Sequence, residues 1–269
     1  MQGADTVPLL SIEGFSAPHG FTVRAGGVSR GQYASMNLGL SSGDDRELVE
    51  ENRRMLLTRI GASREDVCGY HQVHGTRVMV ATPGWFDEKA DAGVSDDPRH
   101  VLVVSAADCY PVLFHDPVTG AAGAAHCGWR GTLGRLPAEV VRTLRDVYGT
   151  EPADLRVAIG QGIGGRCYQV EGEVAEAFAN AGFPDHVSSS DRPPPEMERG
   201  TPGDDRRLLD VHAAILHGLA EAGVPRENIA SLGRCTHCEP DTFFSHRRDA
   251  GATGRMWGFV RPAPAQPRG

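Results

Sequence analysis

The stretch from Val101 to Gly131, VLVVSAADCYPVLFHDPVTGAAGAAHCGWRG, decides the fold of this chain. Its first four residues are β-branched or apolar without interruption, which is typical of a short strand buried on both faces. Two further apolar runs, 111–115 and 121–126, flank a connection rich in Asp, Pro and Gly, and that composition favours a tight link between antiparallel strands. The stretch therefore predicts a buried strand, a β-hairpin and a turn into a helix.

The hairpin brings two reactive side chains together. If His115 pairs with Ala121, Tyr110 lies opposite His126, and the thiol of Cys109 and the imidazole of His126 meet at the same end of the hairpin. A thiol and an imidazole delivered beside the glycine-containing GWRG turn form a candidate metal or nucleophile site.

A purely structural interpretation of these residues stays open at this point. A single buried Cys is often a small hydrophobic residue, and a single His is often a hydrogen-bonded core residue. A third ligand would favour a metal or nucleophile site over a structural role. The stretch His71–Gly75, HQVHG, offers such a ligand just before the apolar run Val78–Val80.

Composition excludes several classes of protein. The chain has 269 residues and a formal net charge of -8, so a nucleic-acid backbone is not expected as a partner. No apolar run approaches the roughly 20 residues that span a bilayer, and no basic segment followed by an apolar core begins the chain. We expect a cytoplasmic protein whose six cysteines are reduced thiols.

Periodicity and capping signals predict the other elements. Helices are expected at 46–60, 133–148, 171–181 and 205–222, the last being the longest. Strands are expected at 20–24, 78–80, 155–159, 229–232 and 256–260. Residues 82–99 are expected to be mostly loop, 188–205 a mobile insertion, and the termini loose. The glycine-rich run 160–165 indicates close backbone approach to a ligand or, preferably, to a neighbouring strand.

Taken together, the chain resembles the laccase-domain family, which is also described as multicopper polyphenol oxidase-like, as purine nucleoside phosphorylase-type and as including a peptidoglycan editing factor. The resemblance covers about Gly20 to Val260. Its motifs, in order, are Gly27-Val-Ser-Arg30, Met36-Asn-Leu-Gly39, Gly43-Asp-Asp45, Glu51-Asn-Arg53, Gln72-Val-His74-Gly75, Ala107-Asp-Cys109, Ala125-His126, Gly128-Trp-Arg-Gly131, Cys167-Tyr168, Phe243-Phe-Ser245 and Arg247-Arg248-Asp249. Departures at Cys127, His246 and Ala250 remove no ligand.

The resemblance implies that His74, Cys109 and His126 are metal ligands and that these three residues form the catalytic centre. Two neutral imidazoles and one thiolate leave a Zn²⁺ ion one open tetrahedral position, which is the pattern of catalytic zinc. A water molecule bound there would become acidic enough to act as a nucleophile. Cu²⁺ is the alternative ion for the same ligands.

The resemblance also implies a fold and an activity. The expected fold is a single α/β domain over residues 1–269, with a central mixed sheet flanked by helices. The expected activity is phosphorolysis of adenosine, inosine, guanosine and methylthioadenosine, together with hydrolytic adenosine deamination. Its partners would be a small-molecule nucleoside and phosphate, on a monomeric protein. Phosphate needs an anion pocket, for which the candidates are Arg30, Arg130, Arg247 and Arg248.

Several alternatives stay open. A peptidoglycan-precursor editing amidase would use the same three ligands, as would a metal-binding module without turnover. A copper polyphenol oxidase needs several copper ions, and the chain has no His-x-His pair. Cys235 and Cys238 form a single CxxC without a second one, which favours a local redox pair or structural thiols over a zinc ribbon. Asp108 and Glu171 are candidate proton carriers.

Overall fold

The structure is a computed structural model that describes residues 7–184, 187–189 and 206–266. Within these ranges the strands form two six-stranded sheets and one three-stranded sheet. The predicted α/β class, with mixed sheets flanked by helices, is confirmed, although two large sheets replace the one expected. No helix in the described part of the chain is long and apolar enough to cross a membrane.

The first large sheet has the order β1-β2-β15-β7-β3-β5. Its strands are β1 (Leu9–Leu10), β2 (His19–Thr22), β15 (Met256–Val260), β7 (Val101–Ala106), β3 (Val67–His71) and β5 (Gly84–Lys89). The second has the order β14-β10-β8-β9-β6-β4. Its strands are β14 (Ile229–Ser231), β10 (Arg156–Ile159), β8 (Tyr110–His115), β9 (Ala122–Cys127), β6 (Ala92–Ser95) and β4 (Val78–Val80).

A small third sheet and five α-helices complete the described elements. The sheet has the order β11-β13-β12, and its strands are β11 (Gln169–Val170), β13 (Arg207–Leu209) and β12 (Ser188–Ser189). The helices are α1 (Arg46–Arg59), α2 (Trp129–Leu133), α3 (Leu136–Tyr148), α4 (Gly172–Asn180) and α5 (Val211–Glu221). Of the expected mobile insertion at 188–205, residues 190–205 lie outside the described ranges, as do residues 1–6 of the expected loose terminus.

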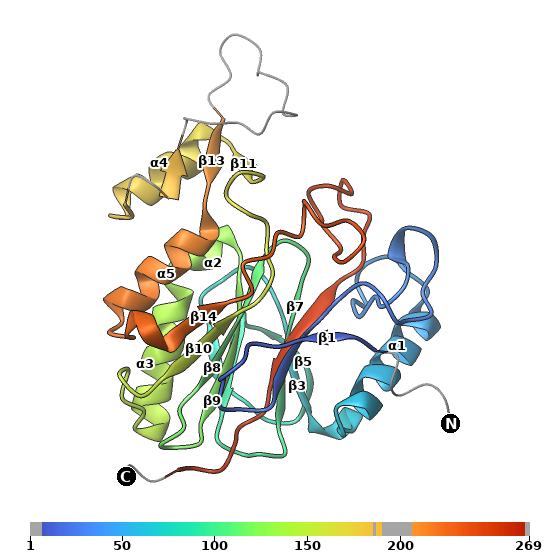
Figure 1. The fold of residues 1–269 in the computed structure, drawn as a ribbon, viewed down its shortest axis with the longest axis horizontal. Coiled ribbons are helices and arrows are strands. Elements are labelled where there is room, and N and C mark those ends of the chain that lie inside the picture. Colours follow the sequence, from blue (N-terminus) through green and yellow to red (C-terminus); the bar gives the residue numbers. More distant parts are fainter. Residues whose placement is uncertain (1–6, 185–186, 190–205, 267–269) are drawn as a thin grey trace.

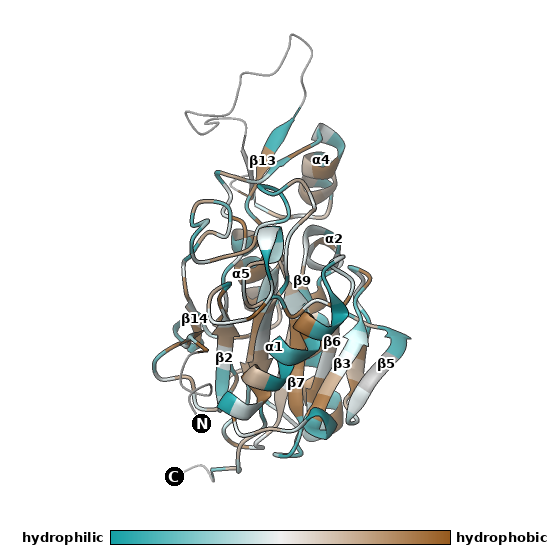
Figure 2. Ribbon diagram, turned by 90° about the vertical axis from the view of Figure 1, so that its right-hand side faces the viewer, coloured by the Kyte–Doolittle hydropathy of each residue, from teal (hydrophilic) through white to brown (hydrophobic). Residues whose placement is uncertain are grey.

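The elements stack in the order helix, sheet, sheet, helices. Figure 1 shows α1 on one side of the two sheets and α3 and α5 on the opposite side. Along β7, Val101 and Val103 belong to the apolar cluster that includes Leu56 of α1, whereas Leu102 and Val104 face the second sheet. The predicted burial of this strand on both faces is therefore confirmed, because a pleated strand sends alternate side chains into two different layers. In Figure 2 the outward-facing turns of α1 are mainly hydrophilic, while β7 behind it carries hydrophobic segments.

The hairpin between β8 and β9 forms as expected, but its predicted register is wrong by one residue. His115 pairs with Ala122, and His126 lies opposite Pro111. The difference arises because Asp116 closes the connection: its backbone N–H donates to the Ala121 carbonyl over 2.8 Å. Such a slip turns every side chain of one strand to the other face relative to its partner. The end shared by Cys109 and His126 is unchanged.

Two other predicted segments differ from the structure. Residues 82–99, expected to be mostly loop, contain β5 and β6, because the small residues of β6 are all buried by antiparallel pairing with β9. The helix expected at 133–148 is α3, which begins three residues later than predicted; a separate helix, α2, precedes it, and Arg135, whose φ of 66° is left-handed, lies between them. Only the five-residue α2 begins next to Cys109 and His126.

The helix expected at 205–222 starts later than predicted and is not the longest. Its first residues form β13 instead, which pairs with both β11 and β12. Asp210 separates strand from helix, since its side chain accepts a hydrogen bond from the backbone N–H of Ala213 as an N-cap. The helix α5 therefore has 11 residues, against 14 in α1.

The glycine-rich run after β10 passes against side chains of neighbouring strands, as predicted. A Cβ atom on Gly162 would lie 2.6 Å from ring atoms of Tyr110. That ring cannot swing aside freely, because the Tyr110 hydroxyl donates to the Ile163 carbonyl over 2.9 Å. Only glycine therefore fits at this position without displacement.

Replacing Gly162 with Ala should lower the free energy of unfolding by about 1–3 kcal/mol through overpacking. Chemical denaturation monitored by circular dichroism measures this change. Gly218→Ala is the matched control: this glycine lies within α5, no atom stands within 4 Å of its would-be Cβ, and Ala should stabilise the helix by about 0.5–1 kcal/mol. An unchanged unfolding midpoint for Gly162→Ala would contradict the packing argument.

Candidate metal centre

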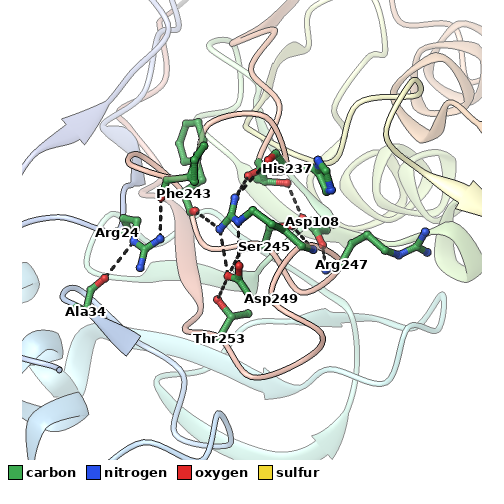
Figure 3. A network of polar contacts seen from close by, with 12 residues as sticks. Arg24, Ala34, Asp108, His237, Phe243, Ser245, Arg247, Asp249 and Thr253 are labelled. Carbon is green, nitrogen blue, oxygen red and sulfur yellow. Dashed lines mark hydrogen bonds and ion pairs between the residues drawn. The ribbon is translucent and has the colours of Figure 1, made fainter. Parts of the chain in front are cut away.

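Cys109 follows β7 on a tightly held turn. The preceding residue, Asp108, has a φ of 90°, a conformation that is costly for a residue with a Cβ atom. Its carboxylate accepts hydrogen bonds from the Thr236 hydroxyl and from the backbone N–H of Arg247, each at 2.6 Å. Its carbonyl accepts another from the N–H of Ile163 at 2.8 Å. Figure 3 shows Asp108 and Arg247 within this network. These bonds hold the turn that presents the Cys109 thiol.

His74 lies on a turn after β3, and that turn is also fixed. The side-chain amide of Gln72 forms two hydrogen bonds with the backbone of Ser105, both of 2.8 Å, and so attaches the turn to β7. His74 itself has a φ of 60°. The third residue, His126, lies near the end of β9 and is buried.

A buried carboxylate, Asp91, connects the two histidines. It accepts backbone hydrogen bonds from Val73, His74 and Gly75 at 3.1, 2.9 and 2.7 Å, and it lies 2.9 Å from Nδ1 of His126. Burial alone would raise the pKa of Asp91, but the hydrogen bonds from His126 and from the backbone outweigh burial and lower that pKa. Asp91 is thus an ionised acceptor that orients His126 and leaves its Nε2 available as a ligand.

The side chains of His74, Cys109 and His126 converge as the sequence predicted. One ligand atom from each lies within 4.8 Å of the others, and Sγ of Cys109 is 4.0 Å from Nδ1 of His74. His74 is exposed, Cys109 half-buried and His126 buried, so the group is open to solvent on one side. A Cβ on Gly128 would lie 2.7 Å from Nδ1 of His74 and 2.9 Å from Sγ of Cys109, so glycine leaves room for the convergence.

The protonation of the thiol and the imidazole is coupled. Burial would raise the pKa of Cys109, but the neighbouring His126 and His74 outweigh burial and lower it below its usual value. Burial would likewise lower the pKa of His126, whereas the Cys109 charge and the hydrogen bond to Asp91 raise it. These shifts favour the thiolate of Cys109, which is the form of cysteine that binds metals, and a bound metal ion would replace the proton on Nε2 of His126.

This donor set fits a metal ion. Two imidazoles and one thiolate whose ligand atoms lie within 4.8 Å of one another are a three-ligand set for Zn²⁺ with an open fourth position. The carboxylate that orients His126 is the outer support that metal-bound histidines usually have. The same donors suit copper, so the geometry supports a metal centre without selecting the ion.

The three residues lie in a cleft of about 710 Å³, a size suited to a small-molecule ligand. Three aromatic side chains line it: Tyr70 of β3, Trp129 at the start of α2 and Tyr168 just before β11. Two of the predicted arginines also line it. The guanidinium of Arg130 lies over the Trp129 ring at 4.3 Å, and that of Arg247 over the Tyr168 ring at 4.8 Å.

The other two predicted arginines are not among the residues lining the cleft. Arg30 is exposed at the start of a short 3-10 turn. The guanidinium of Arg248 binds the Asp249 carboxylate and donates to the carbonyls of Thr236 and Phe243, over 2.7 and 2.9 Å. Figure 3 shows this network, including Asp249 and Phe243. Arg248 therefore holds its loop together.

Sequence reasoning missed three residues of the site. Asp91 lies within residues 82–99, a segment that the sequence predicted to be mostly loop. Arg53 and Arg255 line the cleft, each with a pKa lowered chiefly by burial. The sequence offered one indication for Arg255, which is its position just before the last strand. Met256 pairs with Ala106, so Arg255 lies beside the end of β7.

The predicted proton carriers are occupied or distant. Both carboxylate oxygens of Asp108 already accept hydrogen bonds, as described above. Glu171 is exposed at the N-cap of α4 and is not among the residues lining the cleft. The additional histidine, His71, lines the cleft but does not belong to the group of three ligand atoms.

Comparisons with known proteins agree with this arrangement. A family model described as multi-copper polyphenol oxidoreductase laccase matches residues 18–262. The purine nucleoside phosphorylase of Deinococcus radiodurans is 40% identical over 258 residues, which are 96% of this chain and 94% of that protein. The purine nucleoside phosphorylase YfiH of Escherichia coli is 37% identical over 246 residues, 89% of this chain and 91% of that one. The crystal structure of the hypothetical protein YfiH from Bacillus licheniformis has a TM-score of 0.85 at 31% identity, over 96% of this chain and 98% of that chain.

Replacing Asp91 with Asn should lower metal affinity about 10- to 100-fold, because an amide nitrogen cannot accept the backbone N–H groups and the carboxylate orienting His126 is lost. Competition titration of zinc against a chelating dye measures the affinity. Asp96→Asn, at an exposed acidic residue outside the cleft, is the control and should bind as the parent does. Equal affinity for both variants would remove Asp91 from the metal centre.

Proposed function

The chain belongs to the multi-copper polyphenol oxidoreductase laccase family, and on that basis we propose that it is a metal-dependent purine nucleoside phosphorylase. The observation that carries the proposal is the cleft itself, in which a His–Cys–His group, aromatic faces and arginines occur together. Relatives that align over nearly the whole chain are named purine nucleoside phosphorylases. Its partners would be a nucleoside and phosphate, with no nucleic acid.

The metal would be held by His74, Cys109 and His126, with Zn²⁺ as the proposed ion. When bound, it would act as a Lewis acid and lower the pKa of a coordinated water molecule. The chain's own contribution is orientation: Asp91 fixes the His74 turn and the His126 ring, and Asp108 fixes the turn before Cys109. Such a preorganised ligand set needs little rearrangement during turnover.

The aromatic and cationic groups of the cleft suit the two substrates, which are the purine nucleoside and phosphate. The rings of Trp129 and Tyr168 offer flat apolar surfaces for a purine base. The guanidinium groups of Arg130 and Arg247 lie at those rings, and Arg255, which is half-buried, also lines the cleft. Arginine recognises phosphate through paired hydrogen bonds, so these side chains would bind the attacking anion.

In phosphorolysis a phosphate oxygen forms a bond to C1′ of the ribose while the glycosidic bond to the purine nitrogen breaks. The products are ribose 1-phosphate and the free base. We further propose hydrolytic adenosine deamination in the same cleft, in which water adds at C6 and ammonia leaves. The second reaction needs no phosphate, so the two activities would respond differently to loss of an arginine.

The two alternative enzymatic functions, copper polyphenol oxidase and peptidoglycan-precursor amidase, have less support. A multicopper oxidase needs several copper ions, whereas the described residues offer one group containing histidine, His74, Cys109 and His126. Nothing in the cleft singles out a peptidoglycan precursor over a nucleoside. We therefore use a serine-bearing muramyl precursor as the comparison substrate in the assay below.

Zinc-loaded protein incubated with adenosine and phosphate should release ribose 1-phosphate and adenine, as measured by chromatography. Cys109→Ala should lose the zinc ion held by the His74 group and lower kcat/KM at least about 100-fold, because one of three ligands is removed. A chelator should abolish turnover of the parent, and added zinc should restore it. Turnover of the muramyl precursor without turnover of any nucleoside would refute the proposed function.

Replacing Arg247 with Ala should raise the KM for phosphate roughly tenfold, the equivalent of one lost charged hydrogen-bond contact, and should leave deamination within about twofold. Steady-state kinetics of the two reactions give both values. Arg30→Ala is the matched control, since Arg30 is exposed outside the cleft lining. If phosphorolysis and deamination fall equally, Arg247 supports the cleft instead of binding phosphate.

A further inference from the structure

Three of the six cysteines gather in a second group away from Cys109. The sulfur atoms of Cys167, Cys235 and Cys238 all lie within 4.8 Å of one another, and Sγ of Cys167 is 3.2 Å from Sγ of Cys238. The sequence analysis treated Cys235 and Cys238 as a CxxC without a partner. The structure supplies a third thiol from a distant segment, 71 residues before Cys238.

The backbone brings these segments together for a simple reason. Strands β10 and β14 run parallel as neighbours, so the loops that follow them leave the sheet side by side. Beyond the strands a single further bridge pairs Gly162 with Cys235. The thiol of Cys167 then reaches the CxxC from a turn closed by its own N–H, which donates to the Gly164 carbonyl over 2.8 Å.

The backbone donates a hydrogen bond to one of the three sulfurs. The backbone N–H of Gly164 donates to Sγ of Cys235 at 3.2 Å, and a Cβ on Gly164 would lie only 3.3 Å from that sulfur. An N–H donor to sulfur stabilises a thiolate, and such donors commonly support thiolate ligands of metals. The turn therefore provides both space and a backbone hydrogen bond for the sulfur of Cys235.

Without a cation, however, three adjacent thiolates would repel one another. Burial, and after it the neighbouring Cys238 and Cys235, raise the pKa of the Cys167 thiol well above its usual value. A divalent ion removes this penalty, since it replaces the three thiol protons and neutralises the charge. Thiolates that bind one tetrahedral zinc lie roughly 3.8 Å apart, so small side-chain adjustments would bring all three into bonding distance.

We propose that Cys167, Cys235 and Cys238 form a second metal site, which binds a thiophilic divalent cation, Zn²⁺, through three thiolates and one solvent molecule. Cys167 is buried and Cys238 is exposed, so the ion can enter from the surface and keep one position toward water. Binding releases three thiol protons. This site is separate from the His74 group and does not depend on the reaction catalysed there.

The second site supports the wall of the cleft. Thr236, between the two cysteines of the CxxC, donates its hydroxyl to Asp108, whose neighbour is Cys109. Tyr168, next to Cys167, lines the cleft beneath Arg247. A metal ion joining the two loops would therefore fix residues on both sides of this wall, which is a structural role.

Metal analysis of the full-length protein tests the proposal. After zinc loading under reducing conditions and removal of free metal, the parent should hold about two zinc ions per chain. Cys109→Ala and the double variant Cys235→Ser/Cys238→Ser should each hold about one, and the three changes combined should hold about none. Cys68→Ala, which removes a buried thiol outside both groups, is the control and should retain about two.

Cobalt substitution reports the number of sulfur ligands. Co²⁺ bound to Cys109→Ala should show strong sulfur-to-metal charge-transfer absorption from three thiolates, whereas Co²⁺ bound to the double variant should show a much weaker band from one. The single change Cys238→Ser, at an exposed position, should weaken zinc binding at the second site without unfolding the protein, as circular dichroism would verify. This single variant keeps the proposal testable if the double variant fails to fold.

Three results would overturn the proposal. One is a parent that binds a single zinc ion per chain. Another is a double variant with the same zinc content as the parent. The third is a disulfide between Cys167 and Cys238, found by mass spectrometry in protein purified anaerobically, because oxidised sulfurs could not serve as the ligands. None of these outcomes bears on phosphorolysis at the His74 group, so the two proposals fail separately.

Discussion

The candidate metal centre depends on one buried carboxylate. Asp91 accepts three backbone N–H groups from the His74 turn and contacts the ring of His126, so a single side chain positions two of the three candidate ligands. A buried charge without partners would cost several kcal/mol. Here its hydrogen bonds offset that cost, and they do so only when turn and ring are both in place. The contacts that stabilise the buried Asp91 in the folded chain are therefore the same contacts that position His74 and His126.

A second carboxylate has a comparable role on the other side of the cleft. Asp108 binds Thr236 and the backbone of Arg247, which belong to loops that are far from it in the sequence. These contacts hold Asp108 at a positive φ and so direct Cys109 toward the histidines. The same Thr236 lies inside the CxxC segment. The segments that carry Cys109 and the CxxC are therefore joined by the hydrogen bond from Thr236 to Asp108.

The layered architecture explains why the centre is open to solvent while its supports are buried. The hairpin of β8 and β9 lies between the first sheet and helices α3 and α5, and its residues are buried along their whole length. The residues of the His–Cys–His group lie at strand ends: His74 and Cys109 on turns after β3 and β7, and His126 near the end of β9. Rigid strands thus position the loops, and the loops form the site, which is a common division between scaffold and function.

The sequence by itself determined the features that depend on neighbouring residues: the doubly buried run at Val101, the two strands of the hairpin and the meeting of Cys109 with His126. These follow from alternation, capping and turn chemistry, which act over a few positions. Only the tertiary structure decided the hairpin register, the strands hidden in residues 82–99, the role of Asp91 and the third thiol at Cys167. Each rests on contacts between distant segments, such as the contact between Asp91 and His126, which are 35 positions apart in the sequence. Local patterns do not encode such pairings.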